Sequence, residues 1–229
     1  MGTEKKKRIV TGKSSTDLIF SAYVKNNEEI FPLILSLYVP KGSAIADVTY
    51  GKGVFWKKVA LDDYSLFFSD IKTGTDCRDL PYADETMDCV VIDPPYMEGF
   101  YRRNNTHLAG NGSFSSFRDA YSDGKAYAQK ESMPKYHDAV LDMYYSAGYE
   151  ASRVLKSKGI IIVKCQDEVS ANKQHLTHVE IINEYMKHGL FVEDIFVMIR
   201  NNRPNISTLK KQVHARKNHS YFLVFRKCC

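Results

Sequence analysis

The sequence lacks the spacings of a structural metal site. No two cysteines form a Cys-x-x-Cys pair, and no cysteine and histidine stand at the spacing of zinc ligands. Structural zinc is therefore not expected, and we assign no metal ligand. Several of the five cysteines lie inside apolar runs, as reduced core cysteines do in cytoplasmic proteins. The chain is accordingly expected in the cytoplasm.

Long apolar runs are also lacking. No segment approaches the length that spans a bilayer, and the N-terminus has no apolar region of the signal-peptide kind, so no membrane segment is expected. What is present fits one ordinary globular domain over residues 1–229, with 44% hydrophobic residues and no internal repeat. The net charge of +5 permits a polyanionic partner but does not demand one.

Apolar strand patterns alternate with helical patterns along the chain. We expect strands near 44–48, 66–69, 74–82, 90–92, 160–163, 191–199 and 221–225, and helices within 14–39 and over 136–155 and 176–188. The last two strands are joined by a loop, which indicates an antiparallel pair. The pattern predicts an α/β fold, a mostly parallel sheet with helices on both faces and an antiparallel edge strand.

The most informative stretch is Cys89–Tyr96, which reads CVVIDPPY. Its short β-branched run predicts a buried strand, and the two prolines end that strand because they cannot donate to a ladder. The result is a stiff turn that presents the Asp93 carboxylate and the Tyr96 ring at the carboxyl end of a strand. Ligands bind at this end of open α/β sheets. An ordinary proline-rich turn is the alternative.

Two more strands end in acidic residues. Asp47 precedes a loop with Gly51 and Gly53, where the backbone can approach a ligand closely, and Asp70 follows about twenty residues later. The loop lacks the third glycine of the dinucleotide fingerprint and the Lys-Ser/Thr ending of a P-loop. Asp70 stands where a carboxylate accepts hydrogen bonds from a ribose. The pattern favours a ribose-bearing cofactor without a pyrophosphate.

Taken in order, these motifs resemble the S-adenosylmethionine-dependent amino-methyltransferases of DNA. The match consists of DVTYGKG at 47–53, Asp70, Asp76 before LPY at 80–82, and DPPY at 93–96, and it is most similar to the N6-adenine branch. The resemblance implies a Rossmann-like sheet of seven strands, the class I methyltransferase fold, and S-adenosyl-L-methionine as cofactor. The loop departs from the family's common DPFxGxG, and no large separate target-recognition domain is present.

The resemblance also implies site residues. It assigns catalysis to Asp93, Pro94, Pro95 and Tyr96, and cofactor binding to Phe31, Pro32, Asp47, Tyr50, Gly51, Gly53, Asp70, Ile71, Asp76 and Cys77. In this scheme the Asp93 carboxylate and the Pro94 carbonyl accept from the exocyclic amine, while Tyr96 stacks on the base. A paired base cannot reach such a pocket, so the target must be flipped out or single-stranded.

Residues 97–134 are too long for a routine connection, and we expect an inserted loop that recognises the target. Basic residues interleaved with aromatics there, and basic residues near 201–220, suit phosphates and unstacked bases. The candidates are Tyr101, Arg102, Arg103, Arg118, Lys125, Arg203 and Lys210. A mobile surface loop is the alternative for 97–134, and a solvated connection for the other segment.

The hypothesis from sequence is methylation of a base amine in DNA, with N6 of adenine first. An RNA methyltransferase acting on guanine N2 or adenine N6, and a DNA cytosine N4 methyltransferase, are the alternatives. A non-catalytic nucleic-acid-binding subunit also stays open. DNA is the expected partner, with RNA second, and a homo- or hetero-oligomer could supply recognition.

Overall fold

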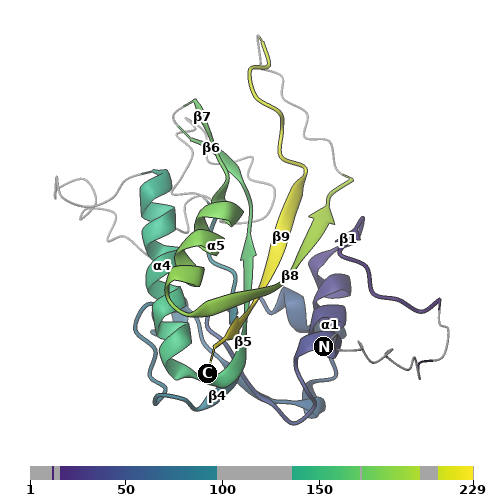
Figure 1. Ribbon diagram of the computed structural model, residues 1–229, viewed down its shortest axis with the longest axis vertical. Helices are drawn as coiled ribbons and strands as arrows, with labels where there is room; N and C mark the ends of the chain where they lie inside the picture. Colours follow the sequence, from purple (N-terminus) through teal and green to yellow (C-terminus); the bar gives the residue numbers. More distant parts are fainter. Residues whose placement is uncertain (1–11, 13–15, 97–135, 171, 202–210, 229) are drawn as a thin grey trace, which may run out of the picture.

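The computed structural model describes residues 12, 16–96, 136–170, 172–201 and 211–228, and a seven-stranded sheet forms its centre (Figure 1). Its strands stand in the order β1-β8-β9-β5-β4-β2-β3. In chain order they are β1 (Ala22–Tyr23), β2 (Ala44–Asp47), β3 (Ser65–Phe68), β4 (Met87–Ile92), β5 (Leu155–Cys165), β8 (Leu190–Ile199) and β9 (His219–Lys227). A separate hairpin consists of β6 (Glu168–Ser170) and β7 (Lys173–His175).

The sheet is mostly parallel, as expected. Among its strands only β9 runs against its neighbours, pairing antiparallel with both β5 and β8. The expected α/β class is therefore confirmed, but the antiparallel strand is inside the sheet and not at its edge. β8 and the two-residue β1 continue the sheet beyond it, with Ala22 opposite Val197.

Helices cover both faces of the sheet. On one face lie α4 (His137–Val154) and α5 (Thr177–Lys187), and on the other lie α1 (Asn27–Tyr38) and the 3-10 helix η1 (Val54–Lys58). In β4, Val90 and Ile92 pack with the α4 and α5 residues, whereas Cys89 and Val91 pack with α1. This strict alternation of buried side chains is what a strand covered on both faces requires. Two short 3-10 helices, η2 (Leu61–Asp63) and η3 (Ile71–Thr73), complete the described elements.

Two local expectations are wrong. The helical pattern expected before residue 27 has no helix within 16–26, because Ala22 and Tyr23 pair with the open edge of β8 instead. The strand expected near 74–82 is absent from that described segment. Its polar groups bond elsewhere than in the sheet, since Asp76 pairs with the nearby Arg78 and the Leu80 N–H donates to Glu150 on α4 at 2.9 Å.

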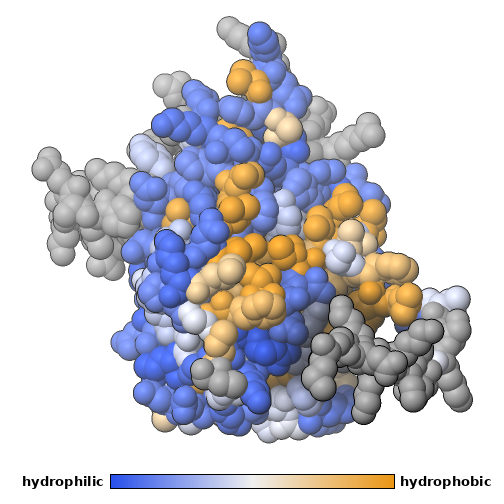
Figure 2. All heavy atoms as spheres, viewed as in Figure 1, coloured by the Kyte–Doolittle hydropathy of each residue, from blue (hydrophilic) through white to orange (hydrophobic). Residues whose placement is uncertain are grey.

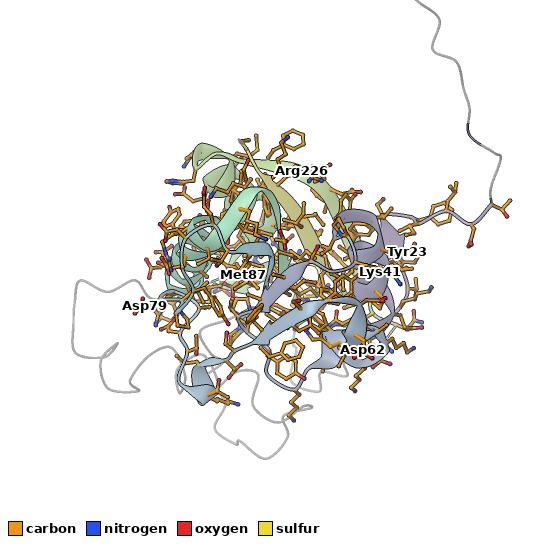
Figure 3. The ribbon with its side chains drawn as sticks, turned by 90° about the horizontal axis from the view of Figure 1, so that it is seen from below. Tyr23, Lys41, Asp62, Asp79, Met87 and Arg226 are labelled. Atoms are coloured by element: carbon orange, nitrogen blue, oxygen red, sulfur yellow. The ribbon has the colours of Figure 1, made fainter. Side chains whose placement is uncertain are left out.

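The acidic residues of the sequence motifs follow the carboxyl ends of β2, β3 and β4. The opposite pole is seen in Figure 3, where Met87 at the start of β4 lies near the middle, with Asp62 and Arg226 toward the periphery. Because β2, β3, β4 and β5 are parallel, their carboxyl ends all lie on the same side of the sheet, at the ends of the strands. The fold thus gathers the predicted site at one pole.

Apolar side chains also gather on the face shown in Figure 2, over the region where β8 crosses the sheet and beside β1. Exposed members of this part of the molecule include Phe20, Val24 and Phe191. Within the described residues, no helix combines the length and the apolar character needed to cross a membrane.

Packing between α4 and α5 depends on a glycine, which gives a testable prediction. A methyl group on Gly148 would collide with the ring of Tyr185, whose hydroxyl donates to the Tyr144 carbonyl at 2.8 Å. Gly148→Ala should therefore lower the free energy of unfolding by about 1–3 kcal/mol in urea denaturation, through overpacking.

The double variant Gly148→Ala/Tyr185→Leu, which removes the colliding ring, tests the cause: the alanine should cost less there than in the wild-type background. The exposed Asp142→Ala on the same helix is the control, with a change of less than about 0.5 kcal/mol. Wild-type stability for Gly148→Ala would contradict the packing described.

Candidate active site

Hydrogen bonds connect the three acidic strand ends. The parallel register of β2 and β4 sets Asp47 beside Val91, and the Val48 N–H donates to the Val91 carbonyl at 3.1 Å. The Asp93 N–H donates to Thr49 Oγ1 at 2.6 Å, and the Gly51 N–H donates to Asp70 Oδ2 at 3.1 Å. The loop after β2 is thus bonded to the residues that end β3 and β4.

The glycine loop has the backbone that its sequence predicts. Gly51 and Gly53 have φ values of +54° and +64°, in the left-handed region that side chains disfavour. A Cβ on Gly53 would also collide with the Tyr50 ring, which stacks on Phe68 with centroids 4.2 Å apart. Both conformation and space therefore require glycine at position 53.

Asp47 is buried beneath this loop. Its carboxylate accepts from Trp56 Nε1 at 2.7 Å and from the Thr49 N–H at 3.1 Å. Burial raises the pKa of Asp47 to about 7, although both hydrogen bonds act in the opposite direction. In this arrangement Asp47 holds the loop to η1, and its contact with a cofactor stays a prediction.

The predicted cofactor residues Phe31 and Pro32 lie in α1. Phe31 is fully buried, and its ring lies 5.0 Å from Phe55 and 5.1 Å from Trp56, centroid to centroid. Phe31 therefore packs against η1, the 3-10 helix that follows the glycine loop. Pro32 lines a small cavity between α1 and the segment 58–64, and a cofactor contact for either residue stays a prediction.

The end of β3 offers the more open part of the site. Asp70 caps η3, accepting from the Lys72 N–H at 2.9 Å, and remains partly exposed. Next to it, the hydroxyl of Ser69 is buried and finds no partner among the described residues. An unpaired buried hydroxyl beside a carboxylate is what a polar ligand such as a ribose could satisfy.

Three further predicted cofactor residues follow Asp70. Ile71 begins η3 and packs against the core, and Cys77 is buried in the same core. Asp76 is partly exposed, and its carboxylate is held by Arg78 at 2.7 Å. The Thr75 N–H donates to the Asp70 carbonyl at 3.2 Å, so this segment lies directly beside the end of β3.

Asp93 and Tyr96 contact each other at the end of β4. The Tyr96 hydroxyl donates to Asp93 Oδ1 at 2.7 Å, both residues are partly exposed, and Pro94 between them is buried. Burial raises the pKa of Asp93, while the bond from Tyr96 and the charges of Lys164 and Arg200 act against that rise. Asp93 thus lies at the rim of the core, with its carboxylate bonded to the Tyr96 hydroxyl.

Lys164 is a site residue that the sequence analysis missed. It lies on β5 one position beyond Val163, which pairs with Ile92, so it is the lateral neighbour of Asp93. Its side chain is fully buried, with Nζ donating to Ser220 Oγ at 2.7 Å and lying 4.0 Å from the centre of the Phe222 ring. Burial lowers the pKa of Lys164, and the nearby Asp93 opposes this. The available signal was a lysine directly after IIIV at 160–163.

A cleft of about 560 Å³ opens beside Arg200, the second cation near Asp93. It lies between the start of α1, Val54 of η1 and the end of β8, and its described lining includes none of Asp47, Asp70 and Asp93. Asn27 in its wall has a buried side-chain oxygen that no described group bonds. The cleft therefore offers space for a ligand and a side-chain oxygen that could accept a hydrogen bond from it.

The predicted nucleic-acid contacts all lie outside the described residues: Tyr101, Arg102, Arg103, Arg118, Lys125, Arg203 and Lys210. The same holds for the expected recognition loop at 97–134. These assignments stay predictions.

Known proteins share parts of this arrangement. A family model described as DNA methylase matches residues 87–228, which include β4, the DPPY residues and β5 but not the glycine loop. Among curated proteins, none gives a significant match.

Solved structures with similar backbones include a candidate DNA modification methylase from Thermus thermophilus in complex with S-adenosyl-L-methionine, with 14% identity, 81% of this chain covered and a TM-score of 0.41. TrmN from Thermus thermophilus has 12% identity, 87% coverage and a TM-score of 0.48. A SAM-dependent methyltransferase from Methanosarcina mazei has 11% identity, 85% coverage and a TM-score of 0.49.

This chain covers 56% of the first structure, 48% of the second and 97% of the third. The family match spans well over half of the present sequence and includes the strand end at which Asp93 and Tyr96 meet. The chain therefore belongs to the DNA methylase family.

Proposed function

We propose that this protein transfers a methyl group from S-adenosyl-L-methionine to the exocyclic amine of a base in DNA, with N6 of adenine as the target. The observation that carries the proposal is the end of β4, where the partly exposed residues Asp93 and Tyr96 contact each other beside a glycine loop, with two prolines between them. Membership of the DNA methylase family supports it.

The proposed chemistry starts from a poor nucleophile, because the amine lone pair of adenine is delocalised into the ring. Asp93 accepts one amine hydrogen and the Pro94 carbonyl accepts the other, so that a pyramidal nitrogen with a localised lone pair is favoured. This is electrostatic stabilisation by fixed acceptors, and no strong base is needed. Tyr96 is available to stack on the base, a contact worth roughly 1–3 kcal/mol by analogy.

The residues around the glycine loop fit the cofactor. Gly51 and Gly53 leave the backbone open to close approach, and the unpaired Ser69 hydroxyl beside Asp70 offers bonds to a ribose. When bound, the cofactor supplies an electrophilic methyl group. The task of this chain is then positioning, because the reacting atoms must be held in line.

Access to the target requires a base outside the helical stack, either flipped from a duplex or in a single strand. The 97–134 segment, which begins directly after Tyr96, is our candidate for holding phosphates and the displaced base. RNA methylation at guanine N2 or adenine N6, and cytosine N4 methylation in DNA, use the same amine chemistry, so product analysis decides among them.

Methyl transfer should depend on Asp93. We expect Asp93→Ala to lower kcat at least 100-fold, because it removes a fixed acceptor, and Asp93→Asn to retain more activity through its amide oxygen. The measurement is transfer of tritiated methyl groups to DNA and to RNA, followed by nucleoside digestion to identify the product.

The exposed Asp62→Ala at the opposite pole is the control and should keep full activity. N6-methyl-2′-deoxyadenosine released from the DNA supports the proposal. A methylated guanine in RNA would show that the substrate is RNA and not DNA. Cofactor binding without methyl transfer to either polymer would refute an enzymatic role.

Cofactor binding should depend on Gly53. Gly53→Ala must strain a positive φ and displace the Tyr50 ring, so we expect calorimetric affinity for S-adenosyl-L-methionine to fall at least tenfold. Gly42→Ala is the matched control, since Gly42 has φ +85° but open space around it and lies in a distant turn. Equal losses in both variants would point to general destabilisation instead.

Lys164 should set the pH dependence. Removing its ammonium in Lys164→Met withdraws a charge that favours the Asp93 carboxylate, so the pKa of Asp93 rises further. The acid limb of kcat/KM against pH should then move to higher pH, by about one unit. The exposed Lys41→Met should leave the limb in place. If the acid limb of the pH profile does not move in Lys164→Met, Lys164 has no part in setting the ionisation on which catalysis depends.

A further inference from the structure

Two histidines and a glutamate from three different elements meet beyond the carboxyl end of β5. His137 is the first residue of α4, His175 the last residue of β7, and Glu180 lies in the first turn of α5. One donor atom of each lies within 4.8 Å of the others. In Figure 1 this is where the upper ends of α4 and α5 lie near the β6–β7 hairpin.

A second carboxylate completes the cluster. Glu168, opposite His175 in the hairpin, lies 2.7 Å from Nδ1 of His137, while Glu180 lies 2.7 Å from Nε2 of the same ring. The side chains of His137 and Glu168 are only 4% and 6% exposed. A buried carboxylate on the far nitrogen of a histidine is the usual means of orienting a metal-binding imidazole.

The four side chains already face one another. Glu168 and Glu180 lie at opposite nitrogens of His137, and the ring of His175 lies beside that of His137 with centroids 3.8 Å apart. His137 and Glu168 are buried, whereas the Glu180 side chain is 35% exposed. A cation between His137, His175 and Glu180 would therefore be bound by groups that converge on one position at the rim of the core.

We propose that His137, His175 and Glu180 bind a divalent transition-metal ion, with Zn²⁺ as the best match to two imidazoles and a carboxylate. Zinc bonds of about 2.0–2.2 Å would set the ligand atoms of a tetrahedron about 3.3 Å apart. Small side-chain shifts from the present arrangement reach that geometry. Glu168 then orients His137 from behind, and a water completes the coordination.

The consequence of such an ion is structural. Two-stranded hairpins are marginally stable alone, and β6–β7 pairs with no other strand in the described part of the chain. An ion bound by His175 ties the hairpin to the starts of α4 and α5. Binding of this ion does not depend on methyl transfer.

The ligands of this site have no recognisable spacing in the sequence, because they are 38 and 5 residues apart and include no cysteine. The expectation of no metal was based on Cys-x-x-Cys and Cys/His spacings alone. Only the packing of the hairpin against two helices brings the three residues together.

The test is metal binding by the full chain after chelator treatment. Zn²⁺ is titrated in competition with a chromophoric chelator, and Co²⁺ is titrated while the d–d absorption bands of a low-symmetry site are recorded. We expect one ion per chain and a higher Tm with Zn²⁺. His175→Ala and the nearly isosteric Glu180→Gln should each weaken binding at least tenfold, and Glu168→Gln should weaken it about 10–100-fold.

His188→Ala is the control, because His188 is an exposed histidine that bonds Glu184 at the other end of α5. It should bind Zn²⁺ as the wild type does. Circular dichroism checks that each variant folds. Failure of the wild type to bind Zn²⁺ or Co²⁺, or equal affinity in folded Glu180→Gln, would overturn the proposal and leave His137 as a proton-bearing bridge between two glutamates.

Discussion

Two carboxylates, Asp47 and Asp93, lie at the ends of neighbouring strands of a mostly parallel sheet. The site depends on the groups that offset the burial of these carboxylates and the repulsion between their charges. Each is desolvated by the core, and the charge of Asp93 adds to the rise in the pKa of Asp47. Asp47 is stabilised by Trp56 and the loop backbone, so the same bonds that satisfy it also fix the glycine loop. Asp93 is balanced by Tyr96 and by two cations, Lys164 and Arg200. The proposed catalytic acceptor and the proposed cofactor loop are therefore parts of one electrostatic arrangement.

The local motifs could be read from sequence because each depends on a short stretch of chain. The strand before Asp93, its termination by two prolines and the positive φ of Gly51 and Gly53 follow from residue type alone. The rest depends on packing. Lys164 looks like the end of an apolar strand until β4 and β5 are aligned, and Phe31 is a core residue because η1 folds back onto α1. The segment near Ala22 has a helical pattern, but the sheet edge offers its backbone better partners.

The β6–β7 hairpin and the start of α4 lie close together at one pole of the sheet. The β6–β7 hairpin follows β5 directly, and α4, which begins at His137, follows the 97–135 segment. An ion at His137, His175 and Glu180 would fix the point at which that segment rejoins the fold. The segment that we propose for target recognition and the proposed metal site are thus neighbours along the chain.

The edge of the sheet has a consequence for how this chain meets other copies of itself. β1 pairs only with Val197 and Met198, so most of the ten-residue β8 has no partner on that side among the described strands. An open strand edge is a template for intermolecular ladders and fibril growth. Here the middle of β8 carries Glu193 and Asp194, with a register irregularity between Val192 and Asp194. Glu193 pairs with Arg226 and Asp194 accepts from the Tyr38 hydroxyl, so both side chains are held within their own chain. The irregularity interrupts the regular spacing of backbone donors and acceptors, and such a bulge opposes the docking of a second β8 along this edge.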